Sequence, residues 1–126
     1  MKPLFPFLGI LLLIPYADSQ EVVTGPFVIR ENVIYHEDTN EPVTGTVEEF
    51  YENGQLKERR NYRDGVREGA WEHFYSNGQL WGRGKLKDGK PEGFSEVFYD
   101  HGQLWRRRNF VEGKQEGTQE WFDKNG

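Results

Sequence analysis

The sequence has no cysteine, and its only methionine is Met1. The missing cysteine excludes a disulfide scaffold, a thiolate zinc site and a cysteine nucleophile. The chain also has no excess of positive charge: it contains 16 Lys and Arg and 21 Asp and Glu, which gives a net charge of −5. Phosphate attraction supplies most of the binding to nucleic acid, so we expect no nucleic-acid partner. Aromatic residues make up 15% of the chain, enough to order a fold.

Residues 1–19 have the features of a removable signal peptide. Their apolar run, 4–14, is about half the roughly 20 residues that a membrane-spanning helix needs. The small residues Ala17 and Ser19 suit the positions before a signal-peptidase cut. We therefore expect cleavage between Ser19 and Gln20 and export to the periplasm or the medium. An uncleaved anchor or a buried first strand is the alternative.

Glycine is frequent, with 15 residues, and most of it is periodic. Three sets recur every 24 residues, which defines an internal repeat. The sets are Gly45, Gly69, Gly93 and Gly117; Gly54, Gly78, Gly102 and Gly126; and Gly65, Gly89 and Gly113. Residues 45–126 therefore hold three full repeats and a final half repeat, and residues 20–44 form a lead-in segment with a short hairpin.

The segment around Asn53-Gly54 predicts a β-hairpin. Asn-Gly between alternating apolar and polar residues favours a two-residue type I′ turn, which needs positive φ at both central positions. Residue i then faces residue 107 − i, so Glu48 faces Arg59 and Phe50 faces Lys57. The same register in later repeats gives two more acid–arginine pairs, Glu72 with Arg83 and Glu96 with Arg107. Each pair adds about 0.2–1 kcal/mol.

Apolar spacing of period 2 predicts successive strands, and no segment between the glycines is long enough for a helix. The predicted strands are 46–52, 55–62, 70–75, 79–86, 94–100, 103–110 and 118–123. We expect an all-β fold, an elongated single-layer antiparallel β-meander of hairpin repeats. In the lead-in segment, 33–35 and 43–44 are expected to pair around Asp38-Thr39-Asn40, and 21–30 is either a strand or a tether.

The predicted register divides the apolar side chains between two faces. One face carries tyrosines and leucines, namely Tyr51, Tyr75, Tyr99, Leu56, Leu80 and Leu104. The other face carries Phe50, Phe74, Phe98, Trp81 and Trp105. Ring contacts in such ladders add about 0.5–1.5 kcal/mol beyond area burial.

The repeated unit, Gly-x-x-Glu-x-Phe-Tyr-x-Asn-Gly-Gln-Leu followed by Tyr-x-Asp-Gly-x-x-x-Gly, resembles the MORN repeat in its bacterial variant form. That variant dominates a family known as YwqK-type antitoxins of toxin–antitoxin systems. The resemblance implies MORN-type hairpins that serve protein–protein contacts or attachment to membranes or phosphoinositides. The catalytic domains that are sometimes fused to such repeats, such as a lipid kinase or a SET domain, are not expected in the 107 residues that follow the predicted signal peptide. The chain departs from the pattern at Gly82, Gly84 and the run Arg106-Arg107-Arg108.

The sequence offers few candidate residues for catalysis or for binding a cofactor. The histidines His36, His73 and His101 form no metal-ligand spacing. We expect His73 to be a strand-surface residue and His101 a turn residue. Calcium binding at the Asp-Gly loops is a minor alternative, because the ligand-dense spacing is missing. We therefore expect no enzyme activity, cofactor or metal.

Charge is unevenly distributed along the chain. Residues 20–52 hold eight acids and one base, a net of −7, whereas residues 53–126 hold 14 bases and 12 acids, a net of +2. Arginines beside tryptophans suit an acidic protein, an anionic lipid headgroup or a glycan. The candidate interaction surface is Trp81, Trp105, Arg106, Arg107, Arg108, Phe74 and Phe98. The alternative is that these bases are solvated and paired with neighbouring acids.

Three functional hypotheses follow. The leading one is an exported, non-enzymatic module that binds another protein, with an antitoxin or immunity role as one instance. Its last strand, 118–123, has an open edge that allows self-association. The second hypothesis is attachment to an anionic membrane surface. The third, a hydrolase of cell-surface polymers, has no nucleophile or acid pair to support it.

Overall fold

The computed structural model describes residues 21–125, and every regular element in that range is a strand. The strands are β1 (Phe27–Arg30), β2 (Val33–His36), β3 (Gly45–Phe50), β4 (Leu56–Arg63), β5 (Val66–Phe74), β6 (Leu80–Lys87), β7 (Lys90–Pro91), β8 (Gly93–Phe98), β9 (Leu104–Val111) and β10 (Lys114–Trp121). The predicted signal peptide, its cleavage site and Gly126 lie outside the described residues.

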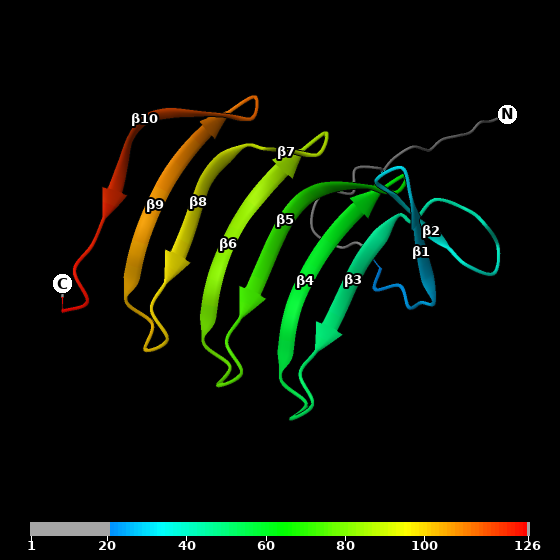
Figure 1. The fold of residues 1–126 in the computed structure, drawn as a ribbon, viewed down its shortest axis with the longest axis horizontal. Helices are drawn as coiled ribbons and strands as arrows, with labels where there is room; N and C mark the ends of the chain where they lie inside the picture. Colours follow the sequence, from blue (N-terminus) through cyan, green and yellow to red (C-terminus); the bar gives the residue numbers. More distant parts are fainter. Residues whose placement is uncertain (1–20, 126) are drawn as a thin grey trace, which may run out of the picture.

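Strands β3 to β10 form one open antiparallel sheet of consecutive hairpins. Its order is β3-β4-β5-β6-β8-β9-β10, and the short β7 pairs with the end of β6. Figure 1 shows a single curved layer that lengthens as hairpins are added, with β1 and β2 at one end. The predicted all-β meander is confirmed. Among residues 21–125 there is no helix long and apolar enough to cross a membrane.

The turn at Asn53-Gly54 is not the predicted type I′ turn. Gly54 N donates to Tyr51 O at 2.9 Å, and Tyr51 N donates to Gln55 O at 2.8 Å. Only Gly54 has positive φ (89°), so the loop is a type I turn followed by a left-handed glycine. The Asn53 side chain is used instead to bond two chain segments, because Oδ1 accepts from Gln55 N and Nδ2 donates to Ser76 O of the next hairpin.

The type I′ geometry occurs in the other set of turns. Asp64 and Gly65 have φ of 50° and 81°, and the corresponding Asp-Gly and Glu-Gly turns repeat these values closely. Strands β5 and β10 begin directly after such turns, at Val66 and Lys114, four residues before their predicted starts. Their first residues are largely charged or polar, so apolar alternation gave no signal for them.

The hairpin turn changes the register near it. Glu48 faces Arg59 as predicted, but a bulge beyond Glu49 places Phe50 opposite Leu56 rather than Lys57. The same shift repeats in the pairs Phe74 with Leu80 and Phe98 with Leu104. The predicted register, in which residue i faces residue 107 − i and Tyr51 therefore faces Leu56, is wrong next to the turn, because a three-residue loop replaces the two-residue loop.

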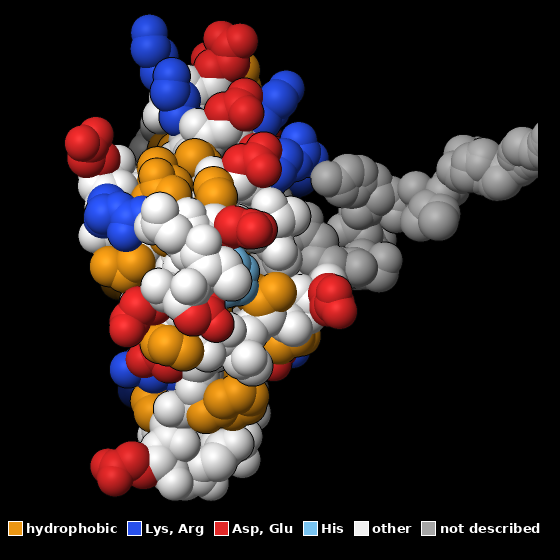
Figure 2. Space-filling model, turned by 90° about the vertical axis from the view of Figure 1, so that its right-hand side faces the viewer, with side chains coloured by type: hydrophobic (Ala, Val, Ile, Leu, Met, Phe, Trp, Pro, Cys, Tyr) orange, Lys and Arg blue, Asp and Glu red, His pale blue; other side chains and the backbone are white. Residues whose placement is uncertain are grey.

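In the lead-in segment, the predicted contact around Asp38-Thr39-Asn40 is present, because Val43 N donates to Ile34 O at 3.0 Å and Tyr35 forms an antiparallel bridge to Pro42. Strands β1 and β2 form a further hairpin around Glu31-Asn32, which was not predicted from the sequence. Ile34 of β2 packs with Val43 and Tyr62 in the one cluster of buried hydrophobic residues in the described chain. The β1–β2 hairpin therefore covers one face of the sheet over its first repeat. Figure 2 views the molecule from the end at which this hairpin lies, where hydrophobic side chains are interspersed with charged ones.

Tyrosine hydroxyls hold successive hairpins together. Each donates to a backbone carbonyl of the next hairpin, in the pairs Tyr51 with Phe74 (2.7 Å), Tyr75 with Phe98 (2.7 Å) and Tyr99 with Phe122 (3.1 Å). Burial, and to a smaller extent the charge of Asp100, raises the pKa of Tyr75. The Tyr75 hydroxyl therefore remains a proton donor at neutral pH.

Replacing Tyr75 with phenylalanine tests this contact between hairpins. The variant leaves the Phe98 carbonyl without its side-chain donor, so the free energy of unfolding should fall by about 1 kcal/mol. Urea denaturation measures it. The matched control is Tyr35→Phe, because no hydrogen bond of the Tyr35 hydroxyl is found within the described chain. Equal losses in the two variants would contradict a role for the tyrosine bond.

Candidate interaction surface

One face of the sheet carries a row of alternating acids and arginines. Strand register places seven residues side by side across it, in the order Glu48, Arg59, Glu72, Arg83, Glu96, Arg107 and Glu120. Arg59 bonds to Glu48 at 3.0 Å and to Glu72 at 2.7 Å. The register of the three predicted acid–arginine pairs is confirmed, and the row also joins neighbouring hairpins. We call this side the ladder face.

Glu96 is the most enclosed acid of the ladder face, with 7% of its surface exposed. Arg83 Nε donates to one carboxylate oxygen at 2.9 Å, and Arg107 Nε donates to the other at 2.8 Å. Burial alone would raise the pKa of Glu96, but the hydrogen bonds from Arg107 and Arg83 outweigh burial and lower it. Glu96 is therefore ionised in the folded protein and ties β6, β8 and β9 together.

All four tryptophans of the sequence lie on the opposite side, which we call the tryptophan face: Trp71, Trp81, Trp105 and Trp121. His73 lies between two of them, with its ring stacked on Trp81 at 5.4 Å and edge-on to Trp71 at 5.3 Å. Because side chains alternate along a strand, Trp71 and His73 point away from their neighbour Glu72 on the ladder face.

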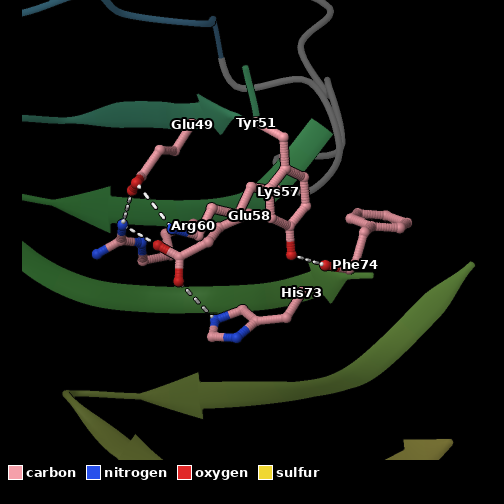
Figure 3. Close-up of polar contacts among 7 residues, drawn as sticks. All are labelled: Glu49, Tyr51, Lys57, Glu58, Arg60, His73 and Phe74. Atoms are coloured by element: carbon pink, nitrogen blue, oxygen red, sulfur yellow. Dashed lines mark hydrogen bonds and ion pairs between the residues drawn. The ribbon is translucent and has the colours of Figure 1, made fainter. Parts of the chain in front are cut away.

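A charged network occupies the start of the tryptophan face (Figure 3). Arg60 bridges Glu49 and Glu58, and Glu58 contacts His73 Nε2 at 2.9 Å. Burial lowers the pKa of His73, although Glu58 acts in the opposite direction. The two acids of this network are thus engaged by Arg60, His73 and, for Glu49, Lys57. The charge of Glu58 also acts on Arg67, where it partly offsets the effect of burial on the pKa of that arginine.

A hollow of about 360 Å³ opens on the tryptophan face over β5 to β9. Gly84 makes room for the ring of Trp71, which lines the hollow, because a Cβ there would lie 2.7 Å from Cζ2 and Nε1 of Trp71. The β6–β8 ladder is also short, with Gly82 opposite Val97 and Arg83 opposite Glu96 as its only pairs in the described sheet. The hollow is lined chiefly by rings and bases, namely Trp71, Trp81, Phe94, Phe110, Arg67 and Arg108.

The basic side chains of this hollow are not paired with acidic side chains in its described lining. Among the described residues, none of those that line it carries a carboxylate. The Nε atoms of Arg67 and Arg108 are buried and make no hydrogen bond within residues 21–125. Burial lowers the pKa of Arg67. The Arg108 guanidinium lies 5.3 Å from the centre of the Phe110 ring.

A second aromatic–basic cluster lies at the C-terminal end. The Arg106 guanidinium lies 5.4 Å from the Trp105 ring and 5.3 Å from the Trp121 ring, and these two rings contact each other edge to face. Trp121 is 54% exposed. Burial, followed by the nearby charge of Arg108, lowers the pKa of Arg106.

The structure divides the predicted surface between two faces. Trp81, Trp105, Arg106 and Arg108 lie on the tryptophan face, and Phe74 borders a smaller hollow beside Trp81. Arg107 instead bonds to Glu96 on the ladder face, and Phe98 contacts Arg83 there, 5.6 Å from guanidinium to ring centre. The prediction that grouped all seven is therefore corrected, because the three consecutive arginines alternate in direction along β9.

The prediction missed Trp71, Trp121, Arg67 and Phe110. A signal for Trp71 was present, because the hairpin register places it opposite the unusual Gly84. Arg67 and Trp121 depend on bulges in the β4–β5 and β9–β10 pairings, which leave no mark in the spacing, whereas Phe110 follows the predicted hairpin register, opposite Gly93. Outside the surface, His101 lies in a turn as predicted, with Nε2 3.3 Å from Lys124 O. Within residues 21–125 there is no cluster of acids and histidines suited to a metal ion.

Comparison with known proteins identifies the type of repeat. Residues 43–64 and 67–88 match the model of the MORN repeat variant. The prediction of MORN-type repeats is confirmed for these two segments, and the MORN repeat is a non-catalytic module. No curated protein matched the chain. No solved structure matched it either. These comparisons do not test the antitoxin label.

Replacing Glu96 with glutamine tests the ladder face. At pH 7 the free energy of unfolding of the variant should be about 1–2 kcal/mol lower than that of the wild type, because the variant loses two charge-assisted bonds to partly exposed arginines. The pKa of Glu96 is lowered by folding, so its contribution is present above the ordinary glutamate value of about 4.3. It is lost as the pH falls through the lower folded pKa.

Urea denaturation at pH 7 and at pH 3 measures both effects. The difference between the wild type and Glu96→Gln should shrink at pH 3. Glu120→Gln is the matched control, since Glu120 belongs to the same row but is exposed. A difference that is the same at both pH values would contradict the account.

Proposed function

We propose that the protein is an exported, non-enzymatic module that binds another protein through the tryptophan face. The observation that carries this proposal is the run of rings and unneutralised bases from Trp71 to Trp121. Tryptophan and arginine are enriched among the residues that dominate binding energy in protein interfaces. MORN repeats are consistent with a protein or membrane interaction module.

The opposite face supports this assignment. Its acids and arginines bond to one another across hairpins, so they contribute to cohesion and present few unneutralised charges. The tryptophan face beyond β5 shows the reverse, with exposed rings next to bases. An exposed face of this kind on a protein marks a site of interaction.

Attachment to an anionic membrane is the second candidate. The cluster of Trp105, Arg106 and Trp121 favours it, because tryptophans and bases suit the headgroup region. The net charge of −5 and the engagement of Arg107 by Glu96 weaken it. An antitoxin or immunity role is one form that protein binding can take, and it rests on the family resemblance alone. Self-association through the open edge of β10 remains a further prediction.

Affinity capture from the extracytoplasmic fraction of the source cells tests the leading proposal. We expect the wild type to retain a partner protein in stoichiometric amount. The double variant Trp105→Ala and Arg106→Gln should weaken that binding about tenfold or more, because it removes a tryptophan and an arginine of the exposed cluster. Lys87→Gln, a charge change at an exposed site on β6, is the control and should bind like the wild type.

The outcomes separate the candidates. Absence of a stoichiometric partner, or unchanged binding by the double variant, would contradict protein binding through this face. Flotation with anionic vesicles that depends on salt and on Trp105 and Arg106, with no protein partner, would instead support membrane attachment. Circular dichroism shows whether each variant is folded.

A further inference from the structure

The second and third repeats leave open a strip that the first repeat covers with its own chain. In the first repeat, Tyr62 is 7% exposed and packs against Ile34 of β2. The residues 24 and 48 positions later, Leu86 and Phe110, are only half-buried and line the hollow beside Trp71. The same face that accepts the β1–β2 hairpin therefore continues, uncovered, into the next two repeats.

The turns at Gly65 and Gly89 also show that the first repeat is covered and the second is not. At Gly65, Val33 and Ile34 of β2 approach so closely that a Cβ would lie 2.3 Å and 2.8 Å from their atoms. Ile34 N also donates to Gly65 O at 3.0 Å. At the corresponding Gly89, the nearest atom belongs to the side chain of Val66, at 3.4 Å from such a Cβ. An extended segment thus lies against the first turn and not against the second.

The chemistry of the strip changes together with its exposure. The column that holds the fully buried Val43 in the first repeat holds Arg67 in the second. Arg108 lies on the other side of the hollow, and the Nε atoms of both arginines are buried without a hydrogen-bond partner in the described chain. Burying a guanidinium without a partner is costly, so a carboxylate entering here gains charge-assisted bonds.

From this geometry we propose that the hollow between β5 and β9 binds an acidic, extended segment of a partner protein. A carboxylate of that segment lies between Arg67 and Arg108, and a neighbouring apolar side chain packs on Trp71, Leu86 and Phe110. The hollow of about 360 Å³ suits one side chain and a carboxylate. This inference rests on the proposed function and names the chemistry of the partner.

Two observations favour a protein segment over a lipid surface. The binding groups lie in a hollow over the short β6–β8 ladder, and a flat bilayer does not follow such a contour. Residues 20–52, which carry a net charge of −7, also repel an anionic bilayer, whereas a short acidic segment in the hollow lies beside the local bases. Glu49 and Glu58 bond to Arg60 and His73, and neither is among the described residues that line the hollow.

Titration of tryptophan fluorescence with short synthetic peptides tests the proposal. The probes are a peptide that alternates aspartate with leucine, one with asparagine in place of aspartate, and one with lysine in place of aspartate. We expect the aspartate–leucine peptide to bind at least tenfold more tightly than the other two and to weaken as salt rises. Anionic phosphatidylserine vesicles form a separate arm.

Variants locate the site. Arg67→Gln with Arg108→Gln should weaken the aspartate–leucine peptide about tenfold or more, and Lys87→Gln should bind like the wild type. Arg108→Glu should lose the aspartate–leucine peptide and gain the lysine–leucine peptide, a gain that a misfolded protein would not show. Each variant leaves Trp105 and Arg106 unchanged.

Three outcomes would contradict the inference. Equal binding of the asparagine and aspartate peptides would show an apolar site without carboxylate recognition, and the proposed function would stand. Failure of all peptides, together with a captured partner that depends on Trp105 and Arg106, would move the contact to the C-terminal cluster. Vesicle binding that depends on Arg67 and Arg108 would assign the hollow to lipid.

Discussion

The row of glutamate and arginine side chains across the ladder face is the interaction on which the rest of the structure depends. A single-layer sheet has no second layer to pack against, and the described chain buries few hydrophobic side chains, clustered mainly where β2 meets the first repeat. Cohesion between hairpins therefore comes from contacts across the repeats. The row links the first repeat to the second and the second to the third, and the tyrosine hydroxyls link successive hairpins near the turns.

This arrangement frees the other face. Because the ladder face links the hairpins, residues on the tryptophan face can change from repeat to repeat without removing those links. The second repeat shows this, since glycine at position 84 replaces the arginine found at positions 60 and 108. The absence of a side chain at Gly84 leaves room for the ring of Trp71, which lines the hollow. The departures from the repeat thus coincide with the part of the surface that is suited to a partner.

Much of the fold was predictable from the sequence, because glycine spacing and opposed charges both report the same register. The turn type was not, since Asn-Gly favours a type I′ turn locally while the Asn53 side chain bonds to the next hairpin. The candidate site was predictable only in part. Trp81, Trp105 and Arg106 are notable in the sequence, but Arg67 reaches the hollow through pairings that depend on bulges.

The run Arg106-Arg107-Arg108 offers the most direct measurement of this division between two faces. Each arginine is replaced singly by glutamine, and the free energy of unfolding is measured in urea at neutral pH. Arg107→Gln should lose about 1–2 kcal/mol, because Arg107 alone of the three bonds to Glu96. Arg106→Gln and Arg108→Gln should remain within about 0.5 kcal/mol of the wild type. Equal losses in all three variants would contradict the account.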